Sequence, residues 1–483
     1  MSVHLFSMML WIIPAAPLAA AGLGLAVKNA SVAKIATLGS ALIAFAASLA
    51  VASDVARHVG GVLLPGWVGV NALAALILVL QSFVGLTAAA YSWGYIPHIA
   101  AGDPARQRRY YVNLNLFQAS LFVVPLLLQP VLTWVAVELT TVLSIFLVSF
   151  GNTREALEAA WKYAVITIMG ATVAAFGIFL LLWGLTRNHV TVQTWSALIR
   201  TAPHMPAGVV ELAFVLILIG FGAKVGLVPM HTWLPDAHSQ APTPVCALLS
   251  GVEVSTVLYV ILRLWPVFTA VHGFSPESWA LVVGLVSVGT AAFLLLQVHD
   301  YKRLFAFSTV EHMGILLLCL GLGPLGALAC VYQLTTHGLT KSLAFYGSGS
   351  VLLATGTRTI GEIRGLLRSA PVAAGALFVG ALAIAGAPPF AVFLSELTVF
   401  RAAATAQDYI VLALLLGFLA IAFLGILRRT GGMMFGQSTH RPSRLPRSMG
   451  AAMIVGIIPV AVLGVYLPLP LYHLLGMAAA TLR

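Results

Sequence analysis

Long apolar runs, separated by short polar or glycine- and proline-containing segments, make up most of this chain. A run of about twenty apolar residues is the length of a helix that crosses a bilayer. The pattern therefore predicts an all-α, polytopic membrane protein with about fourteen spanning helices. These helices are expected near residues 5–27, 32–53, 70–93, 111–129, 131–150, 160–184, 208–230, 243–265, 276–297, 303–322, 325–350, 371–400, 408–427 and 449–472.

Two of the expected helices are interrupted. Gly226, Pro229 and Pro235 punctuate helix 7, and the stretch from Gly386 to Phe390 punctuates helix 12. Interrupted segments at corresponding places in two halves are typical of transporters built from inverted repeats. We therefore expect helices 4–8 and 9–13 to form two inverted five-helix repeats. The predicted units are residues 1–110 (helices 1–3), 111–265 (helices 4–8), 266–430 (helices 9–13) and 431–483 (helix 14).

Composition supports the membrane prediction. Hydrophobic residues make up 60% of the 483 residues, charged residues make up 8%, and the mean hydropathy is +1.01. These values exclude a soluble globular domain. The formal net charge of +11 would suit a nucleic-acid-binding protein, but the basic residues are scattered through short loops, so no nucleic acid partner is expected.

The basic residues also predict the topology. Of the 25 lysines and arginines, 17 follow odd-numbered helices, 6 follow even-numbered helices or end the chain, and the remaining 2 are Lys224 and Lys341 within predicted spans. Positive loops face the cytoplasm. The bias therefore predicts a multi-pass protein of the cell (inner) membrane with both termini on the non-cytoplasmic side. The run from Leu5 to Val27 lacks a basic flank and a cleavage site, so we expect it to be retained as the first helix.

No cofactor is expected in this chain. Cys246, Cys319 and Cys330 lie in apolar runs without CxxC or histidine-ligand spacing, and no iron–sulfur, haem or flavin motif occurs. The sequence thus predicts no metal site and no catalytic centre. Any redox chemistry would belong to partner subunits.

Charged side chains inside the apolar runs are the candidates for function. His337 and Lys341 stand four residues apart, so they share one face of a helix. Placing a lysine at mid-bilayer costs about 2.5–3.5 kcal/mol on insertion scales, and such residues face a partner or a water-filled path. With Lys224, Glu138 and Glu396, they predict a row of titratable groups across the membrane.

Three long motifs carry a family resemblance. They are Phe221 to Val245 (FGAKVGLVPMHTWLPDAHSQAPTPV), Asp300 to Gly314 (DYKRLFAFSTVEHMG) and Thr336 to Ser342 (THGLTKS). Together they resemble the antiporter-like proton-translocating subunits of respiratory complex I, the Mrp cation/proton antiporters and the energy-converting hydrogenases. The resemblance covers roughly helices 4 to 13, and it is greatest to component F of hydrogenase-4.

The resemblance implies roles for five residues. Glu138 would pair with Lys224, and an opposite charge at close range stabilises the charged lysine, whereas separation favours release of its proton. Lys341 would be the central relay with His337 one turn away, and Glu396 would be the acidic exit residue. The alternatives are a protonated structural Glu138, a Lys341 that reaches an interface, a structural His337 and a Glu396 that caps a broken helix.

Further residues are possible relay or access groups. Many relatives carry a lysine or histidine in the middle of helix 8, where this chain has Ser255, and a hydroxyl cannot take a charge. Glu253 is either a substitute or a structural carboxylate. His231 and His238 match a segment that the family uses as a structured loop and proton access, with a metal site as the less favoured alternative. Glu311 and His312 are expected near the cytoplasmic start of helix 10, either in proton entry or in loop anchoring.

The sequence therefore predicts a proton-translocating membrane subunit of a multisubunit redox complex of the hydrogenase-4, formate hydrogenlyase or NADH:quinone oxidoreductase type. Its expected partners are other membrane subunits, a peripheral redox arm and the lipid bilayer. The alternative is an Mrp-type subunit that exchanges Na⁺ or K⁺ for protons without redox coupling. A purely structural scaffold fits the apolar pattern but leaves the buried charges unexplained.

Overall fold

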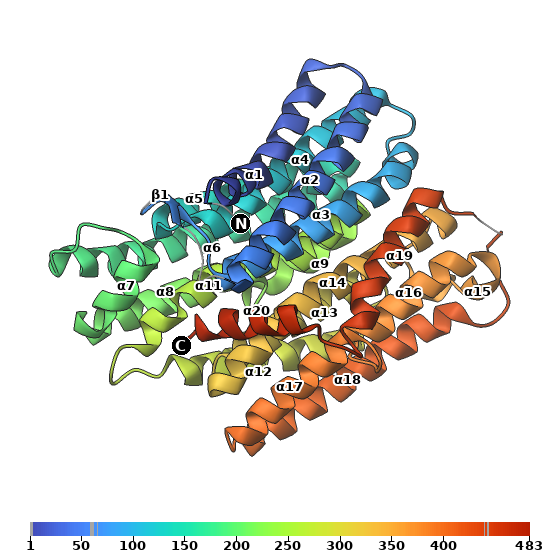
Figure 1. Cartoon of the computed structure of the whole chain (residues 1–483). Helices are drawn as coiled ribbons and strands as arrows, with labels where there is room; N and C mark the ends of the chain where they lie inside the picture. Colours follow the sequence, from blue (N-terminus) through green and yellow to red (C-terminus); the bar gives the residue numbers. More distant parts are fainter. Residues whose placement is uncertain (1–2, 58–61, 65, 439, 442–443) are drawn as a thin grey trace.

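The computed structural model describes residues 3–57, 62–64, 66–438, 440–441 and 444–483. Within these residues the chain is a bundle of long helices that run roughly alongside one another (Figure 1). The exception is an antiparallel ribbon of β1 (Val62–Leu64) and β2 (Val68–Gly69). The predicted all-α class is therefore correct.

The first three helices form one side of the bundle. The α1 and α2 helices pack on each other and on α4, while α3 is buried on most of its surface. Asn71 caps α3 by accepting a hydrogen bond from the Ala74 amide at 2.9 Å. These helices are α1 (Val3–Ala26), α2 (Ala30–Arg57) and α3 (Ala72–Ile99).

The next group of helices surrounds the first interruption. Pro130 begins α5, and this separates α4 from α5 as expected. The short helix α7 was not predicted. The bounds are α4 (Pro104–Leu126), α5 (Pro130–Val148), α6 (Arg154–Arg187), α7 (Trp195–Thr201), α8 (Ala207–Val225), α9 (Trp233–Gln240), α10 (Thr243–Leu248) and α11 (Val254–Thr269), with the π-helical segment η4 (Leu249–Glu253) joining α10 to α11.

The third group surrounds the second interruption. The 33-residue α14 is central to it and packs on α13, α16 and α17. The bounds are α12 (Pro276–Leu295), α13 (Tyr301–Cys319), α14 (Gly323–Thr355), α15 (Leu366–Ser369), α16 (Pro371–Ile384), α17 (Ala391–Thr405), α18 (Tyr409–Met434), α19 (Arg447–Val462) and α20 (Leu469–Ala480).

Both expected interruptions are present. After α8, Gly226 has φ = +89°, a left-handed conformation that glycine adopts without strain, and the chain resumes as η3 (Met230–Thr232) and α9. The α16 helix ends at Ile384, Gly386 has φ = +74°, and α17 begins at Ala391. Each interruption leaves main-chain groups at the helix ends that need other partners.

The single helix predicted over 449–472 is wrong. The chain is non-helical between α19 and α20, where Pro468 caps the second helix and the backbone at Gly464 packs directly on the interruption between α16 and α17. A Cβ atom at Gly464 would overlap the Pro389 carbonyl oxygen. The Tyr332 hydroxyl also donates to the Leu463 carbonyl at 3.0 Å. This contact and two local prolines, Pro468 and Pro470 at the start of α20, thus divide the run that was predicted to be one helix.

Substituting Gly464 by alanine is expected to destabilise this junction by about 1–3 kcal/mol, because two backbones must move apart. Thermal unfolding of the purified protein in detergent measures the effect. Gly476 in α20 is the matched control, since nothing lies within 4 Å of the position that an alanine methyl group would occupy there. An equal response of the two variants would contradict the contact.

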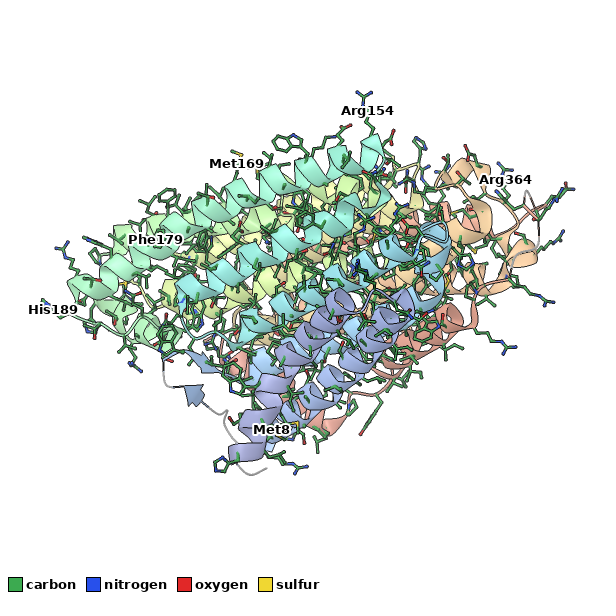
Figure 2. The ribbon with its side chains drawn as sticks, turned by 90° about the horizontal axis from the view of Figure 1, so that it is seen from above. Met8, Arg154, Met169, Phe179, His189 and Arg364 are labelled. Carbon is green, nitrogen blue, oxygen red and sulfur yellow. The ribbon has the colours of Figure 1, made fainter. Side chains whose placement is uncertain are left out.

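Within the described residues, nine helices are long and apolar enough to cross a membrane by length and composition. Some other long helices carry too many polar groups for that criterion, including α14. Figure 2 places Arg154 and Arg364 toward the end of the bundle opposite to His189. The count of fourteen spans, the inverted repeat and the sidedness of the termini stay predictions.

Candidate functional site

Lys224 is held by helix α5. It lies in the last turn of α8 and is 1% exposed. Its Nζ atom donates to the Val137 carbonyl at 2.7 Å and to the hydroxyls of Thr141 and Thr140, the latter at 3.4 Å. The Thr140 hydroxyl itself donates to the Val137 carbonyl at 2.7 Å. The acceptors of the buried ammonium group are thus one carbonyl and two hydroxyls about one turn further along α5. We call this set, Val137, Thr140 and Thr141, the Lys224 seat.

Two carboxylates face Lys224. Its Nζ lies 3.8 Å from Glu253 Oε1 and 4.0 Å from Glu138 Oε1. Glu253 Oε1 also accepts a hydrogen bond from the Tyr163 hydroxyl at 2.9 Å. The one proton of the Thr140 hydroxyl is shared between the Val137 carbonyl and Glu253 Oε1, which lies 3.2 Å away. Glu253 is therefore the closer and better-anchored partner. The family resemblance pointed to Glu138, which lies 86 positions before Lys224, and gave no signal that Glu253, 29 positions after it, would be the nearer partner.

Lys341 has a seat of the same construction on helix α13. Its Nζ donates to the Phe305 carbonyl at 2.6 Å and to the Ser308 hydroxyl at 2.5 Å, and that hydroxyl donates to the same carbonyl at 3.0 Å. In both seats a hydroxyl stands three residues after the carbonyl that it shares with the lysine. Lys341 differs in that no carboxylate of the described residues lies within ion-pair distance of it.

His337 is bound to the π-helical segment η4. Its Nε2 donates to the Ser250 carbonyl at 3.1 Å, so its Nδ1 is the unprotonated nitrogen, which has no partner among the described residues. Ser250 belongs to η4, and π-helical turns recur at functional sites. The Ser250 hydroxyl also bonds to Thr309, next to Ser308, at 2.6 Å. The segment η4 therefore contacts both His337 and the helix that seats Lys341.

Two glycines bring these helices together. A Cβ atom at Gly338 would lie 2.6 Å from the Gly251 carbonyl oxygen, and one at Gly251 would lie 2.8 Å from the Gly338 oxygen. Real Cβ atoms do not approach that closely, so η4 and α14 touch backbone to backbone. The contact lies one residue from both His337 and Ser250.

His312 fastens the second interruption. The Ser395 hydroxyl donates to Gln333 Oε1, which directs the Gln333 amide to His312 Nδ1 at 3.0 Å. His312 Nε2 then donates to the Ile384 carbonyl, the last of α16, at 3.1 Å. The rings of His312 and His337 lie 5.0 Å apart. His312 is therefore a neutral, fully bonded imidazole in this arrangement.

Glu311 and His312 were expected near the start of the predicted span 303–322, and this placement is wrong. Both lie at mid-length of α13, because the helix begins at Tyr301, capped by Asp300, and continues to Cys319. Glu311 is 3% exposed. Glu396 is buried in α17, and its carboxylate lies against Gly386, where a Cβ atom would overlap Oε2.

The remaining candidates do not join one cluster. Ser255 donates to the Gly251 carbonyl of its own helix at 3.1 Å. His231 is half-buried in η3. His238 is fully buried between the rings of Trp233 and Phe345, and neither of its nitrogens has a hydrogen-bond partner among the described residues. A buried imidazole of this kind is commonly satisfied by internal water.

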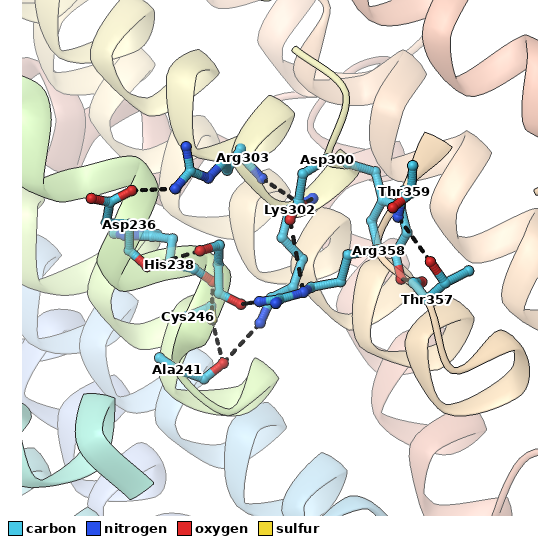
Figure 3. Close-up of polar contacts among 12 residues, drawn as sticks. Asp236, His238, Ala241, Cys246, Asp300, Lys302, Arg303, Thr357, Arg358 and Thr359 are labelled. Atoms are coloured by element: carbon cyan, nitrogen blue, oxygen red, sulfur yellow. Dashed lines mark hydrogen bonds and ion pairs between the residues drawn. The ribbon is translucent and has the colours of Figure 1, made fainter. Parts of the chain in front are cut away.

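Ion pairs and hydrogen bonds tie α9 to the start of α13 (Figure 3). Asp236 pairs with Arg303 and, at 3.0 Å, with Lys162 of α6. The Lys302 ammonium donates to the Ala241 carbonyl at 2.8 Å. Asp300 accepts from the Lys302 and Arg303 amides. The cluster anchors the segment that follows the first interruption.

Replacing Asp236 by alanine is expected to lower the Tm by no more than about 2 °C, because exposed ion pairs contribute little and are screened by salt. Unfolding at low and at high ionic strength measures it. The difference between the variant and the native protein should shrink at high salt. A large loss that is independent of salt would show that the cluster supports more than a surface contact.

The chain matches a known protein family over the region that holds the site. A family model described as NADH:quinone oxidoreductase/Mrp antiporter, transmembrane region, matches residues 129–423, which is more than half of the chain. The chain belongs to this family. The match covers both lysine seats and both interruptions, so the site described above lies inside the family region.

Relatives within the family differ in length. A hydrogenase-4 component F homolog of Methylacidiphilum infernorum is 35% identical over 83% of this chain and 85% of its own length. Hydrogenase-4 component B of Escherichia coli is 29% identical over 80% of this chain and 60% of its own. A Na⁺/H⁺ antiporter subunit A1 of Staphylococcus aureus is 29% identical over 81% of this chain and 51% of its own. The chain thus spans only part of the two longer relatives.

Two solved structures share the fold. A chain of an archaeal membrane-bound sulfane sulfur reductase superposes with a TM-score of 0.89 at 23% identity, covering 98% of this chain and 97% of that one. A chain of the Mrp complex from Dietzia sp. gives 0.87 at 21% identity, covering 99% and 97%. The chain is therefore an antiporter-like, polytopic membrane subunit, and its relatives are components of multisubunit membrane complexes.

Sequence reasoning missed the groups that hold the lysines. Thr140, Thr141 and Ser308 form the seats, Tyr163 anchors Glu253, and Gln333 orients His312. The available signal was the occurrence of hydroxyl and amide side chains in the middle of apolar helices. Their partners come from other helices, so spacing along the chain does not reveal them.

Proposed function

We propose that this chain moves protons across the cell (inner) membrane as one subunit of a multisubunit redox complex, with both termini on the non-cytoplasmic side. The observation that carries the proposal is the pair of buried lysine seats, one beside two carboxylates and one without. A membrane-buried charge is expensive and is retained where it serves a path. The hydrogenase-4 relatives support a redox complex whose peripheral arm carries the electrons.

Lys224 is the switching group of the first half. With Glu138 and Glu253 within 4.0 Å, its ammonium form is stabilised by two opposite charges. Movement of either carboxylate away from Lys224 favours loss of a proton from Nζ. Redox events in the partner subunits would bias that movement. The hydrogen bonds from Tyr163 and Thr140 hold Glu253, so Glu138, whose Oε1 has no hydrogen-bond partner among the described residues, is the more mobile carboxylate.

His337 carries the proton past the continuous helix of α10, η4 and α11. It takes the place of the lysine or histidine expected where this chain has Ser255. Glu253 Oε2 and His337 Nδ1 are both buried and both lack a hydrogen-bond partner among the described residues. They flank Ser250, whose carbonyl fixes His337 with Nδ1 as the accepting nitrogen. Through water, a proton released from the Lys224 group reaches Nδ1, and Nε2 passes its own proton toward the Lys341 seat.

The second half delivers the proton. Lys341 receives it, and Glu311 and Glu396 form the acidic region beyond, with Glu396 as the exit group at the second interruption. His231 and His238 lie on the segment after the first interruption, where we place proton access. The similar lysine seats on α5 and α13 support the predicted inverted repeat of residues 111–265 and 266–430. They also support the division into the units 1–110, 111–265, 266–430 and 431–483.

The test separates electron transfer from proton movement. In the assembled complex, Lys341→Ala should leave redox turnover measurable while protons moved per electron fall to background. Lys162→Ala, which removes an exposed lysine, is the control and should move protons normally. Normal translocation by the Lys341 variant would overturn the proposed path.

A second function is supported by the Staphylococcus aureus antiporter relative and the Mrp fold match. In that case the same path would exchange Na⁺ or K⁺ for protons without electron transfer. Everted vesicles distinguish the two functions. Dissipation of a proton gradient on addition of Na⁺ or K⁺, with no electron donor present, would favour exchange.

A further inference from the structure

Two adjoining cavities lie between α2, α3 and the C-terminal helices. One has a volume of about 580 Å³ and is lined by α2, α3 and α20, and the other has about 430 Å³ and is lined by α2, α3, α14, α19 and α20. They share Leu76, Val79 and Leu471, so they form one groove. Volumes of this size are typical of small-ligand sites.

The groove has a buried floor and an open rim. Leu76 and Leu80 on the floor are 2% and 3% exposed, whereas Leu49, Ile458 and Leu469 on the rim are exposed. The deep part is lined by apolar side chains and by Thr335. At the opposite end, Arg57 and His473 are the ionisable side chains among the described lining residues. The groove therefore has one apolar end and one cationic end.

The length of the groove matches one leaflet. Phe45 in the deep part and Arg57 at the mouth are twelve positions apart on α2, about 18 Å along the helix axis. The hydrocarbon core of a bilayer is about 30 Å thick, so one leaflet is about 15 Å. With Arg57 at the last position of a helix long and apolar enough to span, a groove of this length would reach from the interface to about mid-membrane. A spanning helix of a partner would need a groove through both leaflets.

We propose that this groove binds one glycerophospholipid, with an acyl chain between α3, α14 and α19 and the phosphodiester at Arg57. The guanidinium matches phosphate oxygens in a bidentate manner, and no ion pair occupies Arg57 within the described residues. His473 provides a second polar group at the mouth. The break between α19 and α20 forms the deep wall, since Pro459, Val462 and Leu463 line it.

The bound acyl chain would support the proposed proton path without forming part of it. Leu80 on the groove floor packs against Gly338, where a Cβ atom would meet its Cδ2 at 2.8 Å. Thr335 and Leu339, which flank His337 on α14, line the same cavity. An acyl chain there fills space behind the closest approach of α14 and η4. The lipid site stands independently of whether the path carries protons.

Photolabelling of the assembled complex tests the proposal. Vesicles of phosphatidylethanolamine and phosphatidylglycerol carry a trace of phosphatidylglycerol with a diazirine near the end of one acyl chain. After irradiation, peptide mapping locates the label. We expect labelling of residues 455–463 above that of the exposed helix α18. Val79→Trp, which fills the shared part of the groove, should abolish the excess, whereas Phe176→Trp on the exposed face of α6 should not.

The headgroup is tested separately. Arg57→Ala should reduce groove labelling about tenfold, equivalent to about 1.4 kcal/mol, while Arg200→Ala, another exposed arginine, should leave it unchanged. A diacylglycerol probe without phosphate should label the groove of the native protein as weakly as phosphatidylglycerol labels the Arg57 variant. Groove labelling no higher than on α18, labelling unaffected by Val79→Trp, or a photocrosslinker at Leu471 that captures a polypeptide would overturn the proposal. Labelling of α18 and an unchanged Tm verify that each variant is folded.

Discussion

Replacing Glu138 and Glu253 together by glutamine is expected to abolish proton translocation. The double variant leaves the buried Lys224 with hydrogen bonds but no carboxylate within 4.0 Å among the described residues. An unpaired buried charge costs about 3–5 kcal/mol, so the lysine either destabilises the protein or stays deprotonated. In both cases it can no longer alternate between two protonation states. Translocation per electron and the Tm are the two measurements.

The single variants reveal which carboxylate matters more. Glu253→Gln should be the more harmful of the two, because Glu253 is closer to Lys224 and is held by Tyr163 and Thr140. Glu158→Gln is the control, since Glu158 forms an exposed ion pair with Lys162 and its loss should change nothing measurable. A double variant with normal translocation would contradict the switching role of Lys224.

The second large effect is expected from Gly338→Ala. The added methyl group would meet the Gly251 carbonyl oxygen at 2.6 Å and Leu80 at 2.8 Å, so η4 and α14 must separate. Overpacking of this kind costs about 1–3 kcal/mol, and it also disrupts the bond between His337 and the Ser250 carbonyl. We expect a lower Tm together with loss of translocation.

Gly417→Ala on α18 is the matched control for that substitution. Nothing lies within 4 Å of the added methyl group there, and alanine favours a helix over glycine by about 1 kcal/mol. The control should therefore be neutral or stabilising. If the Gly338 variant keeps both its Tm and its translocation, the backbone contact is not needed for the crossing.

The sequence predicts the coarse architecture well because its signal is local. Twenty-residue apolar runs and glycine–proline interruptions are properties of single segments, and Pro130, Gly226 and Gly386 act within a few residues of themselves. The break between α19 and α20 is partly of this local kind, since Gly464, Pro468 and Pro470 stand in or beside it. The close approach of Gly464 to the backbone of Pro389, 75 positions earlier, is the part that the sequence does not reveal.

Some residues of the candidate site can be recognised in the sequence, and others only in the structure. Lysines and carboxylates in apolar runs stand out in the sequence, and the geometry brings Glu253 to Lys224 and His337 to Ser250. The hydroxyls that seat the lysines do not stand out, because serine and threonine are common in apolar helices and reveal their role only through a partner on another helix. Glu311 and His312 were assigned to the start of their helix, although the predicted span of 303–322, close to the observed Tyr301–Cys319, already places them near its middle.

The shared carbonyl in each lysine seat has an energetic consequence. When Lys224 leaves, the Thr140 hydroxyl still donates to the Val137 oxygen, and Ser308 does the same for Phe305 when Lys341 leaves. The vacated acceptor is therefore never bare, and the penalty of about 1–3 kcal/mol for an unsatisfied buried group does not arise. Departure of a lysine therefore costs the hydrogen bonds of its own ammonium group and, for Lys224, the attraction of two carboxylates, but it adds no penalty for a bare carbonyl.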